Sequence, residues 1–379
     1  MNFISIKNKV FFLFLFLLIV KSFGQTISLS KAAHVSVISC GTGNEVYSLF
    51  GHTAIRVQDS LNGIDLVYNY GAFDFNTPNF VMKFTKGDLQ YFAVVNSFPD
   101  FINQYRYEKR SVFEQELDIS TELKQQLFDN LNTSLASGES YYTYKFIDRN
   151  CTSMVVDIIN KTLGSTVIIK KDDIDLTYRS ILYPYFDDHF YEKLGTSIIF
   201  GTKVDQKGTQ IFLPLELKKS LETITFRNQI LAKESKTLLD YKNEVPFSWW
   251  NNTYTYLILL LLIISVNKKS ISLFYFTLMA VIGLFFSFVG FYSQHLELAN
   301  NYNILLFNPT LLGLLFYYWK KNKQGLQILA ILNLLCLVAY FLVIINKAHL
   351  NIVLPLIITN AIIMIRILIE NRKRIPGVV

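Results

Sequence analysis

The sequence predicts an exported α+β domain over residues 25–248, followed by an all-α bundle of five transmembrane helices over 249–379. Three observations support this division. The N-terminus has the pattern of a secretory signal, the next region alternates between strand and helix patterns, and the last third consists of apolar runs with short polar breaks. With 51% hydrophobic residues in 379, the chain is too apolar for one ordinary soluble domain.

The N-terminal segment predicts export. Lys7 and Lys9 precede a short apolar run over 10–20, and small residues follow it. This pattern is typical of a secretory signal peptide over 1–24 that is cut before Gln25. The apolar run is short for a full membrane span, and an uncleaved anchor is the alternative.

The exported region predicts a compact domain of strands and helices. Alternation of apolar and polar residues predicts strands at 34–38, 53–57, 66–70, 88–95 and 112–117. Helical spacing and capping residues predict helices over 98–110, from Ser120 to about Gly138, and from Asn150 to Gly164. A further helical period rich in Lys and Glu predicts an amphipathic connector over 215–241 that leads to the membrane.

The C-terminal third predicts five membrane spans and one orientation. Its apolar runs lie near 251–266, 271–292, 304–319, 325–345 and 352–369, after an interfacial Trp249–Trp250 pair. If the first domain is exported, the basic clusters at Lys268, Lys320 and Arg372 and the C-terminus all fall in the cytoplasm. The net charge of +7 therefore reflects membrane topology, and we expect no nucleic-acid partner.

Cys151 and His52 are the candidate catalytic residues. Asn150 is a good N-cap, so Cys151 would lie in the first turn of a helix, where the dipole and free amides favour a thiolate. His52 directly precedes a predicted strand, which would hold its imidazole on a rigid element as a proton acceptor. Asn69, on the next predicted strand, is the candidate group that orients this imidazole.

Other interpretations of these residues stay open. Cys40 and Cys151 are the only cysteines of the exported region, and such pairs often form disulfides. A single histidine such as His52 is more often a packed or surface residue than a catalyst. The cysteines and histidines lack the spacing of a zinc site, and we expect neither a metal nor a cofactor.

Three segments resemble a bacterial protein family. They are SLFGHTAIRV at 48–57, VYNYGAFDF at 67–75 and NCT at 150–152. Together with the apolar C-terminal region, they are similar to the Lnb-type lipoprotein N-acyltransferases, which have an N-terminal periplasmic domain before several spans. The order of histidine before cysteine is also similar to circularly permuted papain-like folds, which include the NlpC/P60 amidases and the lecithin:retinol acyltransferases. The resemblance implies a permuted papain-like periplasmic domain.

The resemblance also implies an activity at the surface of the bacterial inner membrane. Cys151 would take an acyl chain from a membrane phospholipid as a thioester, with His52 as base. The α-amine of a diacylglyceryl-cysteine on an apolipoprotein would then accept the chain as an amide. Two alternatives remain, namely a membrane-anchored cysteine amidase or peptidase acting on cell wall, and a non-catalytic scaffold or sensor with a disulfide between Cys40 and Cys151. Five spans exceed what a peptidase needs for tethering, which favours lipid substrates.

The polar loop at 294–303 is a secondary candidate. Proteins of the family have a similar loop of His and Asn before a span, and this resemblance implies a substrate-binding role for His295 near the lipid headgroups. A solvated connector is the alternative.

Overall fold

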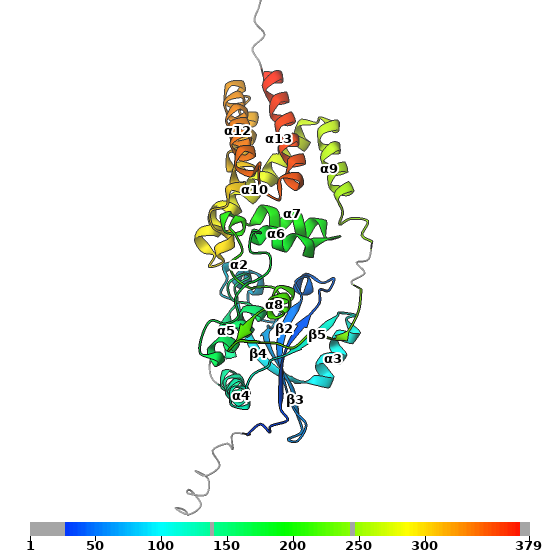
Figure 1. The fold of residues 1–379 in the computed structure, drawn as a ribbon. Helices are drawn as coiled ribbons and strands as arrows, with labels where there is room; N and C mark the ends of the chain where they lie inside the picture. The colour runs from blue at the N-terminus through cyan, green and yellow to red at the C-terminus, as the bar shows by residue number, and fades with distance from the viewer. Residues whose placement is uncertain (1–26, 137–139, 243–246, 372–379) are drawn as a thin grey trace, which may run out of the picture.

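The computed structural model describes residues 27–136, 140–242 and 247–371 (Figure 1). It has an N-terminal domain of sheet and helices, followed by apolar helices, as the sequence predicts. The predicted signal peptide and the basic cluster around Arg372 lie outside the described residues.

An antiparallel sheet forms the centre of the N-terminal domain. Its strand order within the described residues is β6-β4-β3-β2-β1-β5-β9. The strands are β1 (His34–Cys40), β2 (His52–Asp59), β3 (Ile64–Ala72), β4 (Gln90–Ser97), β5 (Val112–Glu116), β6 (Tyr141–Thr143) and β9 (Lys236–Leu239). The first five of them confirm the strands that alternation predicts. β2 and β3, which carry His52 and Asn69, are interior strands, so each pairs with a neighbouring strand on both of its edges.

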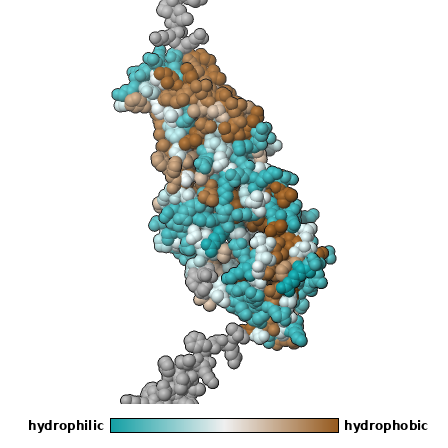
Figure 2. Space-filling view, turned by 60° about the vertical axis from the view of Figure 1, so that its left-hand side comes forward, coloured by the Kyte–Doolittle hydropathy of each residue, from teal (hydrophilic) through white to brown (hydrophobic). Residues whose placement is uncertain are grey.

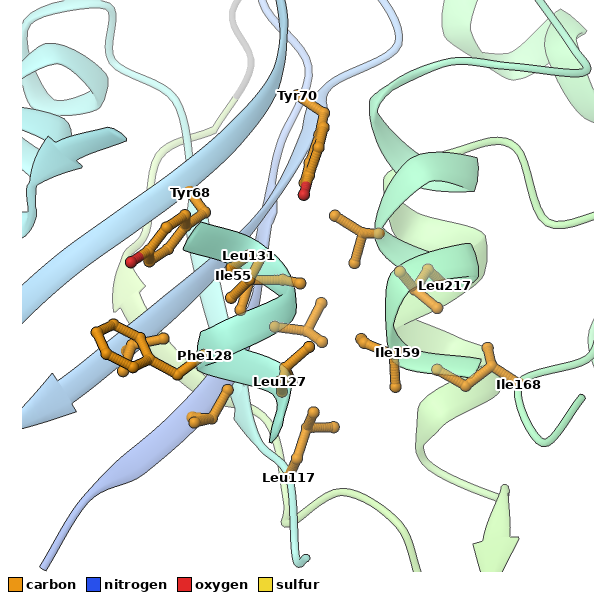
Figure 3. Packing of buried hydrophobic residues seen from close by; sticks show 14 of the residues in the cluster. Ile55, Tyr68, Tyr70, Leu117, Leu127, Phe128, Leu131, Ile159, Ile168 and Leu217 are labelled. Atoms are coloured by element: carbon orange, nitrogen blue, oxygen red, sulfur yellow. The ribbon is translucent and has the colours of Figure 1, made fainter. Parts of the chain in front are cut away.

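Helices cover both faces of this sheet. α4 (Thr121–Ala136), α5 (Cys151–Leu163) and α8 (Pro214–Leu221) pack on one face, and α3 (Phe98–Tyr107) packs on the other. Figure 3 shows Leu127 and Leu131 of α4 beside Ile55 of β2, with Ile159 of α5 close by. The leucines of α4 recur at four-residue steps, which places them on one side of the helix. Their burial fixes α4 and α5 against the sheet.

The helix expected over 215–241 is wrong beyond Leu221. The chain there forms a small hairpin of β7 (Thr225–Phe226) and β8 (Gln229–Ile230), and then enters the main sheet as the edge strand β9. Arg227 and Asn228 have φ angles of 51° and 66°, and positive φ at both central residues is what a type I′ hairpin turn requires. The described part of the connection to the membrane is therefore strand and loop.

The C-terminal region forms helices in all five apolar runs. They are α9 (Thr253–Val266), α10 (Lys269–Tyr292), α11 (Leu312–Trp319), α12 (Lys323–Ile344) and α13 (Leu350–Asn371). Of the described helices, α10, α12 and α13 are long and apolar enough to cross a membrane by length and composition. α9 has 14 residues, and Pro309 shortens the third run, so that α11 has only 8. The count of five spans stays a prediction.

The sheet domain lies directly against the outer loops of the membrane helices. α6 (Tyr178–Leu182) and α7 (Phe190–Ile199) lie between the two parts (Figure 1). Asp205, whose side chain is 9% exposed, accepts hydrogen bonds from Arg179 at 2.7 Å, from Tyr302 at 2.5 Å and from Lys347 at 3.0 Å. Tyr302 follows α10 and Lys347 follows α12, so one carboxylate joins two outer loops to the sheet domain.

A short helix that the sequence reasoning did not predict also lies at this junction. α2 (Phe80–Lys86) is held at its C-terminal end by the loop after α10, where the backbone N–H of Gln294 donates to the carbonyl of Lys86 at 2.7 Å. Because α10 ends at the sheet domain, its first residue, Lys269, lies at the far end of the bundle, as the predicted orientation requires. Hydrophobic surface gathers over the membrane helices, and the sheet domain is mostly hydrophilic with smaller apolar patches (Figure 2).

Candidate active site

Cys151 is the first residue of α5, as the sequence predicts. Asn150 is the N-cap, and its side-chain oxygen accepts from the backbone amides of Thr152 at 3.0 Å and Ser153 at 3.1 Å. Ser153 completes a capping box, because its hydroxyl accepts from the amide of Asn150 at 2.8 Å. The side-chain amide of Asn150 also donates to the carbonyl of Phe212 at 3.0 Å. The thiol of Cys151, a residue of intermediate exposure, is thus held at the positive end of the helix dipole.

His52 is the first residue of β2, and a chain of amides orients its ring. The Nε2 atom of His52 lies 3.1 Å from Oδ1 of Asn69 on β3. The Nδ2 atom of Asn69 donates to Oδ1 of Asn96 at 3.0 Å and to the carbonyl of Val67 at 3.3 Å. Oδ1 of Asn69 therefore acts as acceptor, Nε2 of His52 carries a proton, and Nδ1 is the ring nitrogen left for the thiol.

Gly71 lies between the imidazole and the thiol. It occupies an irregularity in the pairing of β3 with β4, with φ of 117°, a region that favours glycine. A Cβ atom built on Gly71 would lie 3.5 Å from the Cβ of Cys151 and 3.9 Å from Cε1 of His52. The two predicted catalytic residues therefore flank the same point of the backbone, although α5 and β2 are far apart in sequence.

The environment of Cys151 favours the thiolate. Burial is the largest influence and would raise the pKa of this thiol, but the net shift is downward because several opposing interactions together outweigh it, led by the charge of His52 and its hydrogen bond to the sulfur. The backbone amide of Thr53 and the hydroxyl of Thr152 lower the pKa further by hydrogen bonding. The hydroxyls of Thr53 and Thr152 also lie 2.9 Å apart, which ties the start of α5 to β2.

Cys40 has the opposite environment. It is fully buried in the cluster on the α3 side of the sheet, and burial raises the pKa of its thiol to about 12. Both Cys40 and Cys151 are free thiols in the structure. The disulfide interpretation is therefore wrong for this structure, because strand β1 directs Cys40 into the α3 side while α5 packs on the other face.

Three tyrosine side chains, those of Tyr91, Tyr142 and Tyr144, form an aromatic cluster near Cys151. Tyr142 of β6 is buried, and its hydroxyl lies 3.9 Å from the Cβ position of Gly71, with no hydrogen-bond partner among the described residues. Tyr91 lies 6.3 Å from Tyr142 and 4.3 Å from Tyr144 between ring centroids. Sequence reasoning missed Gly71, Asn96 and Tyr142, because their proximity to Cys151 depends on strand pairing that no local pattern specifies.

His295 lies apart from the pair of Cys151 and His52. It is buried in the loop after α10, and its Nε2 atom lies 2.9 Å from the carbonyl of Phe84 on α2. Gly87, which ends α2 with φ of 74°, leaves room for the ring, because a Cβ there would approach Cδ2 of His295 to 2.9 Å. The structure thus places His295 as a packing contact between α2 and the membrane helices. A substrate-binding role for it stays a prediction.

Comparison with known families covers both parts of the chain. Residues 21–182 match the model of the Lnb N-terminal periplasmic domain, and residues 246–374 match the model of the Lnb transmembrane domain. No curated protein and no solved structure matches the chain. The likeness to permuted papain-like folds therefore stays a prediction. The two matches lie in the order that the resemblance implies and span most of the sequence, so the chain belongs to the Lnb family.

Proposed function

We propose that this protein is a lipoprotein N-acyltransferase of the bacterial inner membrane, with its active site on the periplasmic side and several membrane spans. The observation that carries this proposal is a cysteine–histidine–asparagine arrangement in a domain that rests against membrane helices. The activated thiol supports acyl transfer through a covalent intermediate. The adjacent bilayer supports lipid substrates, because an active site at the membrane surface shortens the search for them.

In the first step, the thiolate of Cys151 attacks an ester carbonyl of a membrane phospholipid. The new C–S bond forms a thioester, the ester C–O bond breaks, and the proton that His52 took from the thiol passes to the departing oxygen of the lysophospholipid. Asn69 keeps the imidazole oriented during this transfer. No cofactor or metal takes part in the proposed step.

In the second step, the α-amine of a diacylglyceryl-cysteine lipoprotein attacks the thioester. A C–N bond forms, the C–S bond breaks, and His52 accepts the proton that the amine loses. The free thiol returns as the amide product leaves. A thioester reacts with amines much more readily than an ester does, which is why the covalent intermediate helps this reaction.

Each step develops negative charge on the carbonyl oxygen, and two groups beside Cys151 suit its stabilisation. The first amides of a helix have no carbonyl partner within the helix, and that of Cys151 is the one nearest the reacting sulfur. The second group is the hydroxyl of Tyr142, which is buried beside Gly71 and without a partner among the described residues. We assign both as donors to this oxyanion.

The test is complementation in bacteria that lack their own lipoprotein N-acyltransferase. The chain and its Cys40→Ser and Cys151→Ala variants are expressed, and lipoprotein N-termini are analysed by mass spectrometry. We expect N-acylated termini with the chain and with Cys40→Ser, and free amines with Cys151→Ala. Free amines in all three strains, with the protein present in the membrane, would contradict the proposal.

A further inference from the structure

Helix α2 is fixed to the outer end of the spanning helix α10. The loop after α10 satisfies the last three carbonyls of α2. Ser293 Oγ donates to Thr85 O at 2.7 Å, Gln294 N donates to Lys86 O at 2.7 Å, and His295 Nε2 lies 2.9 Å from Phe84 O. These bonds hold α2 at the level where α10 leaves the membrane.

The outward side of α2 exposes large apolar side chains. Val81 is 73% exposed and Met82 is 62% exposed, and Phe75 in the preceding loop is 67% exposed. Lys83 lies on the same helix, and a cationic side chain among apolar ones is typical of a helix that lies at the headgroup level of a bilayer. Phe291 in the last turn of α10 is 92% exposed. Apolar side chains are therefore exposed both on α2 and on α10, the two helices that these hydrogen bonds connect.

A continuous series of aromatic rings leads from this surface to the thiol. Phe73 contacts Phe75 with ring centroids 4.8 Å apart, Phe80 of α2 at 5.8 Å, and Tyr91 at 5.0 Å. Tyr91 lies 6.3 Å from Tyr142, whose hydroxyl reaches the point beside Gly71 that Cys151 also flanks. The rings therefore join the exposed side chain of Phe75 to the residues beside the sulfur, and Tyr91 and Tyr142 are the buried members of the series.

We propose that α2 and Phe75 form the entry surface through which a phospholipid of the outer leaflet places its acyl chain along Phe73 and Tyr91 and its ester at Cys151. This assignment rests on the proposed function and names the path of its acyl donor. The bilayer is the occupant of the exposed face, because hydrogen bonds join α2 to a helix embedded in that bilayer. Lys83 is positioned on the same helix to contact the lipid phosphate.

The test compares two acyl donors on the full chain reconstituted in vesicles of phosphatidylethanolamine and phosphatidylglycerol. One donor is a phospholipid of the vesicle with labelled acyl chains, and the other is water-soluble p-nitrophenyl acetate. The measured quantity is the ratio of the two rates of acylation of Cys151. We expect this ratio to fall at least tenfold in the Val81→Glu/Met82→Glu variant. The matched control is Leu61→Glu, because Leu61 is 75% exposed at the opposite end of β2 from His52, and there we expect the wild-type ratio.

A ratio that stays at the wild-type value in the α2 variant would overturn the entry surface and leave the proposed function standing. A wild-type protein that reacts with p-nitrophenyl acetate but takes no label from phospholipid would overturn both. A second measurement does not depend on catalysis. With p-benzoylphenylalanine placed at position 82, irradiation should crosslink the protein to labelled phospholipid, and with the same group at position 61 it should not. Equal crosslinking at the two positions would also overturn the entry surface.

Discussion

Asn69 holds the imidazole of His52 through a 3.1 Å hydrogen bond between Oδ1 and Nε2, and Asn96 in turn holds the amide of Asn69 at 3.0 Å. The bond fixes which ring nitrogen faces Cys151, and it stabilises the imidazolium that forms when the thiol loses its proton. A hydrogen bond to a charged group is worth about 1.5–3 kcal/mol. The hydrogen bond from His52 to Asn69 therefore contributes the most stabilisation when the imidazole is protonated and charged.

Replacement of Asn69 by Ala should lower the rate of Cys151 acylation by about 10- to 100-fold, the loss that corresponds to one such hydrogen bond. Asn96→Ala should have a smaller effect in the same direction, because it acts through Asn69. Single-turnover acylation with labelled phospholipid measures both. Wild-type rates in Asn69→Ala would show that this residue does not orient His52.

The reactivity of Cys151 should depend on pH as a thiol of lowered pKa. A lower pKa means that thiolate is present at lower pH, so the midpoint of the pH dependence of iodoacetamide alkylation should lie below the ordinary thiol value of 9.0. His52→Ala should move this midpoint upward, because the charge and hydrogen bond of His52 are lost. Cys40, with a pKa raised to about 12, should stay unmodified in the folded protein. A midpoint that is identical in the wild type and His52→Ala would refute the ion pair.

Tyr142→Phe should separate transition-state stabilisation from thiol activation. Removal of one oxyanion donor typically lowers the rate by about 10²- to 10³-fold. We expect a loss of this size in acyl transfer, with little change in iodoacetamide alkylation, which forms no oxyanion. Tyr141→Phe is the matched control, since Tyr141 is the neighbouring residue of β6 and is 59% exposed. Equal effects of the two variants would exclude the proposed role of Tyr142.

Asp205 should contribute strongly to the stability of the junction with the membrane helices. Its removal leaves the guanidinium of Arg179 buried without its carboxylate, which costs about 3–5 kcal/mol. Asp205→Ala should therefore lower the thermal unfolding midpoint in detergent well below that of Asp175→Ala, whose ion pair with Lys207 is exposed. Similar midpoints for the two variants would contradict this role.

The pKa of Asp205 also predicts how the stability of the protein depends on pH. Burial would raise the pKa of Asp205, but Arg179 and hydrogen bonds from Tyr302 and Lys347 lower it below its ordinary value of 3.8. The ionised carboxylate of Asp205 therefore contributes fully to the free energy of unfolding above pH 3.8. This contribution is lost as the pH falls through the lower pKa that Asp205 has in the folded protein. The midpoint difference between wild type and Asp205→Ala should stay constant near neutral pH and shrink only in acid.

The sequence predicted the parts of the site that depend on local signals. Asn150 marks a helix start because its side chain caps the next turn, and the alternation around residues 53–57 marks the strand that follows His52. The proximity of the imidazole to the thiol depends instead on strand pairing, which places both beside Gly71. Asn96 and Tyr142 depend on the register of β4 and β6, which no local pattern encodes. The helix expected over 215–241 failed because the residues of β9 pair with β5, and this long-range pairing overrides a local helical period.

The acyl state of Cys151 tests the central claim most directly. The full chain, reconstituted with a phospholipid that carries labelled acyl chains and without lipoprotein acceptor, is digested and analysed by mass spectrometry. The account predicts one hydroxylamine-sensitive acyl group on Cys151, absent from His52→Ala and transferred to an added diacylglyceryl-cysteine peptide as an amide. An unmodified Cys151 under these conditions, in a protein whose thiol still reacts with iodoacetamide, would contradict it.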